Sequence, residues 1–153
     1  MKIEAYSDGG CIGNPGPGGW AYVLVLDQGE KTGSGGNPDT TNNRMELTAV
    51  IQALKDINSY KPWRKSGVVF YTDSQYVHRG ITQWIKRWEI NGWRTSEKKP
   101  VKNVDLWRKL SELSEALEIE WRWVRGHSGN RLNELCDRLV KQEMRTVSDE
   151  IEA

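Results

Sequence analysis

The sequence contains few cysteines and no long apolar segment, features that mark disulfide-rich, secreted and membrane proteins. Only 2 of its 153 residues are cysteines, and Cys11 and Cys136 stand far apart, which argues against a CxxC motif and a disulfide framework. We therefore expect both thiols to be reduced. No apolar run approaches the length of a membrane span, and the opening residues MKIEAYSD contain no signal-peptide core. These absences predict a cytoplasmic protein without a membrane partner.

Excess charge and phenylalanine are also scarce, whereas tryptophan is abundant. The net charge is only +1, so attraction to an anionic partner would need a local basic patch. Phe occurs once but Trp 8 times, and tryptophan suits both core edges and stacking surfaces. The length fits one domain, which we place at residues 1–145. The acidic tail TVSDEIEA, residues 146–153, lacks a hydrophobic pattern and is expected to be disordered.

Hydrophobic periodicity predicts an α/β fold. Alternating or continuously apolar segments predict strands at 2–7, 20–26, 30–35, 68–72 and 119–124. Helical spacing of apolar residues predicts a helix around 47–54, two or three helices within 75–115, and a last helix over 133–144. This order is typical of a mixed sheet that begins with an antiparallel meander and is flanked by helices.

A glycine-rich stretch follows the first predicted strand, DGGCIGNPGPGGWA from Asp8 to Ala21. Its last six residues spell G-x-G-x-x-A, but a dinucleotide site needs a helix after the glycines, and here a strand follows. No Gly-Lys-Ser/Thr follows either, which excludes a P-loop. The pattern predicts a sharp turn directly after Asp8. It is either a plain connection or a place where a polymer backbone can lie close to that carboxylate.

Four carboxylates occupy positions that could converge. Asp8 and Asp73 end predicted strands, while Glu46 and Asp137 stand on predicted helices. Three of them have an ordinary alternative: Glu46 could favour a helix dipole, Asp73 could cap a helix, and Asp137 could pair with an arginine. Several carboxylates in one place repel one another, and a hard divalent cation reverses that cost. Oxygen ligands without a Cys/His cluster favour Mg²⁺ or Mn²⁺ over zinc.

Five separated motifs then carry a resemblance to a known family: DGGCIGNPGPGGW, TTNNRMEL, TDSQYVHRGITQWI, GWRTSEKKPVKNVDLW and VRGHSGNRLNELCD. In order and spacing they resemble ribonuclease H of the bacterial type, the ribonuclease HI family. The resemblance implies a ribonuclease H-like fold, a five-stranded mixed sheet of order 3-2-1-4-5 with strands 1–3 antiparallel. It also implies an endonuclease that hydrolyses the RNA strand of RNA–DNA hybrids and leaves 5′-phosphate and 3′-hydroxyl ends.

The resemblance further implies a catalytic quartet that binds two Mg²⁺ ions, with Mn²⁺ as a possible substitute. The quartet falls on Asp8, Glu46, Asp73 and Asp137, with Asp8 bridging the ions. His127, in the loop Arg125–Gly129, resembles a histidine that assists proton transfer or product release. No organic cofactor is implied, and a monomer is the expected state.

Contacts to the hybrid are implied by the same resemblance. Backbone groups directly after Asp8 would contact RNA sugars, and Asn14, Asn42 and Gln75 would contact the minor groove or sugars. Thr41, Asn42 and Asn103 would contact the phosphates of the DNA strand. A basic, tryptophan-bearing protrusion would also bind the hybrid. The expected substrate-binding residues are Gly9, Gly10, Cys11, Asn14, Thr41, Asn42, Gln75, Trp84, Trp88, Lys98, Lys99 and Asn103. Asp39 and the pair Glu89-Ile90 stand where basic residues are common in the family, which predicts weaker phosphate attraction.

Two other functions are compatible with the sequence. The chain could be a non-catalytic hybrid-binding module, although four carboxylates in the family pattern argue against it. It could also be a resolvase- or transposase-like nuclease of the same fold, although those reactions normally need additional DNA-binding or dimer-forming parts.

Overall fold

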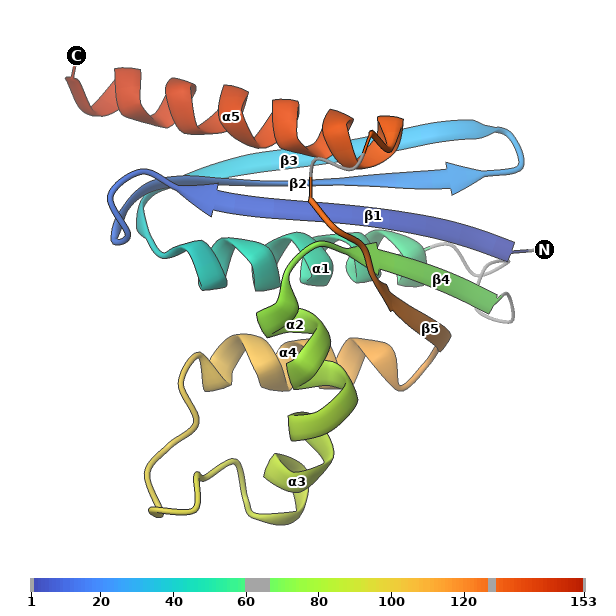
Figure 1. Ribbon diagram of the computed structural model, residues 1–153, viewed down its shortest axis with the longest axis vertical. Helices are drawn as coiled ribbons and strands as arrows, with labels where there is room; N and C mark the ends of the chain where they lie inside the picture. Colours follow the sequence, from blue (N-terminus) through green and yellow to red (C-terminus); the bar gives the residue numbers. More distant parts are fainter. Residues whose placement is uncertain (1, 60–66, 127–128, 153) are drawn as a thin grey trace.

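A five-stranded mixed sheet organises the chain in the computed structural model, which describes residues 2–59, 67–126 and 129–152 (Figure 1). Its order is β3-β2-β1-β4-β5, with β1, β2 and β3 antiparallel and β4 and β5 parallel to β1. The predicted fold and strand order are confirmed. The strands are β1 (Lys2–Cys11), β2 (Gly16–Leu26), β3 (Gly29–Thr40), β4 (Gly67–Thr72) and β5 (Glu118–Trp123).

Helices cover both faces of the sheet (Figure 1). They are α1 (Asn42–Ser59), α2 (Gln75–Arg79), the π-helical segment η2 (Gly80–Trp84), α3 (Ile85–Ile90), α4 (Val104–Ser114) and α5 (Arg131–Glu152). One face carries α1, with α4 packed behind it, and the opposite face carries α5. No helix in the described ranges has the length and apolar character that crossing a bilayer requires.

The main core lies between the sheet and α1. Leu47, Val50, Ile51 and Leu54, whose spacing predicted this helix, are all buried there, together with Trp107 of α4. A smaller cluster around Tyr6, Val23 and Cys136 lies on the α5 face. The helical periodicity therefore identified the buried side of α1 correctly.

The glycines behind Asp8 belong to a strand, so the predicted turn directly after that residue is wrong. Strand β1 continues to Cys11, and Gly9 and Gly10 pair with Trp20 and Gly19 of β2. A Cβ added to Gly9 would lie 2.3 Å from the backbone carbon of Met45 in α1. Side chains alternate between the faces of a strand, so Gly10 faces Val140 of α5 instead. The bare Cα of Gly9 allows α1 to approach the sheet closely, whereas a Cβ at Gly10 would make only ordinary contacts.

Two further boundaries differ from the sequence expectation. Strand β2 begins at Gly16 rather than at residue 20, and β3 continues through Asn37 and Pro38 to Thr40. A register shift between Gly16 and Gly18 accommodates this extension. Glycine and proline usually mark turns, but here pairing between neighbouring strands overrides that local preference.

The expectation of a disordered tail is also wrong, because α5 continues to Glu152. Val147 is only 8% exposed, and its Cγ2 atom would lie 2.3 Å from a Cβ added to Gly36 of β3. Val140 and Val147 are seven residues apart, about two helical turns, and thus share one face. This face of α5 packs on glycines of the sheet, Val140 near Gly10 and Val147 near Gly36.

Replacing Val147 by Ala should lower the free energy of unfolding by about 1–2 kcal/mol, because buried methyl groups would be removed. Chemical denaturation measures the change. Ile151→Ala on the same helix is the matched control, since Ile151 is 54% exposed, and it should have little effect. Equal effects of the two substitutions would contradict the packing of the tail against β3.

Candidate active site

Three carboxylates meet at one edge of the sheet. Asp8 lies on β1, and Asp73 directly follows β4, whose Thr72 pairs with Ser7. Glu46 projects to the same place from the N-terminal part of α1. One oxygen of each of the three carboxylates lies within 4.8 Å of the others, a spacing that suits a shared metal ion. The sequence predicted this convergence, and the described residues bring these three together.

Glu46 is held in place by the backbone of β1. The N–H of Gly9 donates to Glu46 Oε1 at 2.6 Å and to Asp8 Oδ1 at 2.9 Å, and Glu46 is only 5% exposed. Gly9 can offer its N–H in this way because α1 lies against its bare Cα atom. The bond orients one oxygen of each carboxylate and leaves the other available for a ligand.

Burial and mutual repulsion disfavour ionisation at this site. Burial, followed by the charge of Asp73, raises the pKa of Asp8 from its ordinary 3.8 to about 7. Burial, followed by the charges of Asp8 and Asp73, also raises the pKa of Glu46 well above its usual range. Burial raises the pKa of the nearby Cys136 thiol, which makes that cysteine an unreactive neighbour. The donor set is therefore oxygen, and it fits a hard divalent cation.

Two further residues expected in the site, Asp137 and His127, are not part of the close cluster among the described residues. Within the described residues the close cluster does not include Asp137, whose Oδ2 lies 3.0 Å from Lys141 Nζ one turn along α5. Its charge nevertheless contributes to the raised pKa of Asp8, so Asp137 borders the cluster. His127 lies outside the described residues, and its expected role stays a prediction. The preceding Gly126 is described, and a Cβ added there would lie 3.2 Å from Asp73 Oδ2.

Several expected substrate contacts gather beside the carboxylates. Asn14, in the turn between β1 and β2, accepts the backbone N–H of Asn42 at 2.8 Å and faces the Cys11 thiol at 3.4 Å. Thr41 immediately precedes α1, and its Oγ1 accepts the backbone N–H of Arg44. Gln75 is exposed at the start of α2. The turn that carries Asn14 is thus fastened to the start of α1.

The tryptophan-bearing segment forms a groove farther from the carboxylates. The rings of Trp84 and Trp88 lie tilted to each other, 5.8 Å apart between ring centres, and Trp88 also meets the buried Trp107 edge-on at 5.4 Å. Trp88 is thus both part of the core boundary and part of the surface. The groove has a volume of about 350 Å³ and is lined by Trp84, Arg87, Trp88, Asn91, Arg94, Thr95 and Ser96. Lys98 and Lys99 are exposed on the loop beside it.

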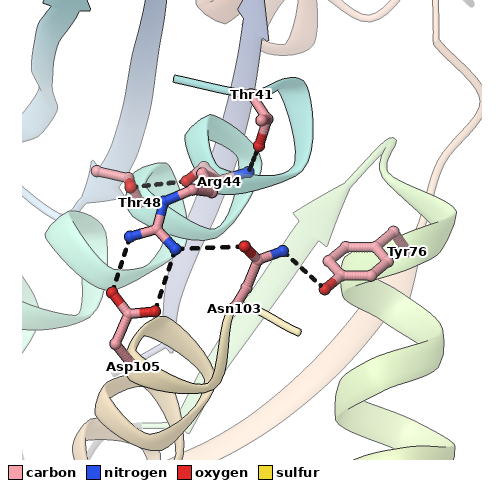
Figure 2. A network of polar contacts seen from close by, with 6 residues as sticks. All are labelled: Thr41, Arg44, Thr48, Tyr76, Asn103 and Asp105. Carbon is pink, nitrogen blue, oxygen red and sulfur yellow. Dashed lines mark hydrogen bonds and ion pairs between the residues drawn. The ribbon is translucent and has the colours of Figure 1, made fainter. Parts of the chain in front are cut away.

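A polar network that the sequence did not predict connects three helices near this groove (Figure 2). Arg44 of α1 forms an ion pair with Asp105 of α4 and a hydrogen bond to Asn103, which in turn donates to Tyr76 of α2. Of these four residues, only Asn103 was expected from the sequence to contact substrate. The signal for Arg44 was its place inside the motif TTNNRMEL, between Thr41 and Glu46, which are both expected site residues.

Comparisons with known proteins show which proteins the chain is similar to. A family model described as RNase H matches residues 1–145. Ribonuclease H of Ehrlichia ruminantium is 54% identical over 144 residues, which cover 94% of each chain. Ribonuclease H of Cupriavidus necator is 49% identical over 147 residues, covering 96% of this chain and 98% of that protein. The solved structure of LC9-RNase H1, a type 1 RNase H with the type 2 active-site motif, matches with a TM-score of 0.82 at 32% identity. It covers 95% of this chain and 72% of that chain.

The raised pKa of Asp8 predicts an unusual pH dependence of stability for the metal-free protein. The folded state holds the proton more tightly than the unfolded state, so stability should fall as pH rises from 3.8 to about 7. Asp8→Asn removes this pH-dependent decrease. Its melting temperature in EDTA should therefore exceed that of the parent above about pH 7, with the gain disappearing below pH 3.8.

Asp105→Asn is the control of opposite sign. The Arg44 guanidinium lowers the pKa of Asp105, so this carboxylate stabilises the fold above its unfolded pKa. Its replacement should lower the melting temperature at neutral pH and have no effect in acid. A melting temperature of Asp8→Asn that equals that of the parent at every pH would contradict the raised pKa of Asp8, and with it the burial and charge repulsion that cause it.

Proposed function

Because this chain belongs to the ribonuclease H family, we propose that it is an endonuclease that hydrolyses the RNA strand of RNA–DNA hybrids. The observation that carries the proposal is the convergence of Asp8, Glu46 and Asp73, one oxygen of each within 4.8 Å of the others, at one edge of the sheet. The expected products have 5′-phosphate and 3′-hydroxyl ends.

The carboxylates fit divalent ions. Burial and then the charges of the neighbouring carboxylates raise the pKa of both Asp8 and Glu46, and bound cations would offset this cost. We propose that Asp8, Glu46, Asp73 and Asp137 hold two Mg²⁺ ions when substrate is present, with Mn²⁺ as a possible substitute. Bound ions of this kind supply an activated water and neutralise charge on the leaving 3′ oxygen.

The residues of the chain contribute orientation and proton handling. The Gly9 N–H holds Glu46 and Asp8 in a fixed relation, so their ligand oxygens need little rearrangement. Lys141 pairs with Asp137 one turn along α5. By resemblance to the family, His127 assists proton transfer or product release.

Recognition of the hybrid depends on the 2′-hydroxyl, which distinguishes RNA from DNA. The backbone of Gly9, Gly10 and Cys11 follows directly on Asp8 and is proposed to meet the RNA sugars. Side chains proposed to contact the minor groove or the backbone of the hybrid are Asn14, Thr41, Asn42, Gln75, Trp84, Trp88, Lys98, Lys99 and Asn103. A monomer without an organic cofactor, acting in the cytoplasm, stays a prediction of the sequence.

Asp8→Asn should reduce Mg²⁺-dependent cleavage of an end-labelled hybrid to background, because an amide is a poor ligand and leaves the metal site one charge short. Cleavage is followed on a gel with Mg²⁺ or with EDTA, and the product ends are mapped. Asp27→Asn is the matched control at the opposite end of the β2–β3 hairpin and should retain full activity.

The same assay separates the alternatives. A DNA duplex and an RNA duplex are tested as alternative substrates in place of the hybrid. Cleavage of the DNA duplex would favour a resolvase-like nuclease. Binding without cleavage would favour a hybrid-binding module. Full activity of Asp8→Asn would overturn the assignment of the metal site.

The lysines beside the tryptophan groove are expected to act through phosphate attraction. The double substitution Lys98→Ala and Lys99→Ala should raise KM for the hybrid and make it less dependent on salt. The slope of log KM against log salt concentration should fall by about 1 for each phosphate that is no longer neutralised. The charge-matched control is Lys2→Ala with Lys55→Ala, which removes two exposed lysines elsewhere. An unchanged KM and salt slope in the first variant would exclude a role for this loop.

A further inference from the structure

Asn103 stands at the N-cap of α4 but does not cap it. Its backbone is left-handed, with φ 59° and ψ 32°, and among the described residues its side chain makes no capping bond to the helix. Asparagine at this position normally uses its side-chain oxygen to satisfy a free N–H of the helix. Here the amide is instead turned between Arg44 and Tyr76 (Figure 2). A side chain that gives up the stabilising role of its position is available for another one.

The partners of Asn103 determine which way its amide points. The guanidinium of Arg44 can only donate, so the amide atom 3.2 Å from its Nη1 must be the oxygen Oδ1. The Nδ2 group then faces the Tyr76 hydroxyl, also at 3.2 Å. Nδ2 carries two N–H groups, and Tyr76 accepts only one of them. The second N–H has no partner in the described part of the chain.

Tyr76 does not fix this orientation by itself. Its hydroxyl oxygen accepts Asn103 Nδ2 and also the indole N–H of Trp107 at 2.9 Å, but its own O–H could equally donate to an amide oxygen. If the Asn103 amide rotated by half a turn, Tyr76 would still satisfy it. The donor-only side chain of Arg44 is therefore the group that decides the orientation.

Arg44 is itself held from several sides. Its Nη1 and Nη2 atoms reach the two oxygens of Asp105 at 3.1 and 2.8 Å. Its backbone N–H donates to Thr41 Oγ1, and its carbonyl accepts the Thr48 hydroxyl at 2.7 Å. The planar fork of arginine can serve Asp105 and Asn103 together, whereas the single ammonium of a lysine offers no such fixed geometry.

We propose that Arg44 is a positioning residue for hybrid binding, which fixes the Asn103 amide so that its second N–H donates to a phosphate oxygen of the DNA strand. This inference rests on the proposed function. A phosphate oxygen accepts hydrogen bonds and repels an amide oxygen, so the orientation of the amide decides whether the contact attracts or repels. Arg44 acts through Asn103 and need not touch the substrate.

A double-mutant cycle tests the proposal, with KM and kcat measured on a hybrid in Mg²⁺. The variants are Arg44→Ala, Asn103→Gly and the double substitution; glycine tolerates the left-handed backbone of position 103. Each single substitution should raise KM about three- to tenfold, as expected when one hydrogen bond is removed, and leave kcat within about twofold. The double variant should have the KM of Asn103→Gly alone, because Arg44 acts only through that amide.

Two further variants separate positioning from charge and from stability. Arg44→Lys keeps the positive charge but lacks the fork, and it should still raise KM. Lys31→Ala is the matched control. Lys31 lies near the start of β3, and its replacement removes a positive charge and the ion pair with Asp56 of α1. It should lower the melting temperature but leave KM unchanged.

The outcomes are distinct. Multiplicative KM effects in the double variant would overturn the proposal, because Arg44 would then act independently of Asn103. A normal KM in Arg44→Lys, or a decrease confined to kcat, would also overturn it. If the parent protein fails to cleave the hybrid at all, the proposed function falls instead.

Discussion

Helix α1 reaches the backbone of β1 at Gly9, and the geometry of the site depends on that contact. Any side chain at this position would collide with the backbone of Met45 and Glu46. Because none is present, the Gly9 N–H can bind Glu46 and Asp8 at once. Glu46 of α1 is thereby brought beside Asp8, near the end of β1. The close approach of a helix to a strand is a packing feature, but its consequence is chemical.

The contact has an electrostatic cost. Three acids in a buried place disfavour ionisation, which is why the pKa of Asp8 rises to about 7. The hydrophobic core under α1 supplies the stability that keeps them together without metal. The site is thus prepared for cations by a fold that tolerates repulsion in their absence. Such local cost is common at functional sites.

The two faces of the sheet make separate contributions. On one face α1 carries both Glu46 and Arg44. Arg44 is hydrogen-bonded to Asn103 at the start of α4, and Asn103 to Tyr76, so α1 links the carboxylate site to the expected DNA-strand contact. On the other face α5 carries Asp137 and lies on the glycines of β1, β2 and β3. Val147, near the C-terminus of α5, is buried against Gly36 of β3, so the helix contacts the sheet up to its last turns. The site therefore depends on helices from both layers.

Sequence patterns were enough to predict the fold class and three acids that converge, and the family resemblance was enough to predict the strand order. The regular apolar spacing in α1 and the apolar run of β4 indicate which residues lie in the core, so these elements can be predicted from local sequence alone. The tertiary structure alone decided that the glycines behind Asp8 continue a strand, that the acidic tail is helical, and that Arg44 orients Asn103. Each of these depends on a surface supplied by a distant part of the chain. A local pattern carries no record of that partner, because strand pairing and helix docking are decided only when the two surfaces meet.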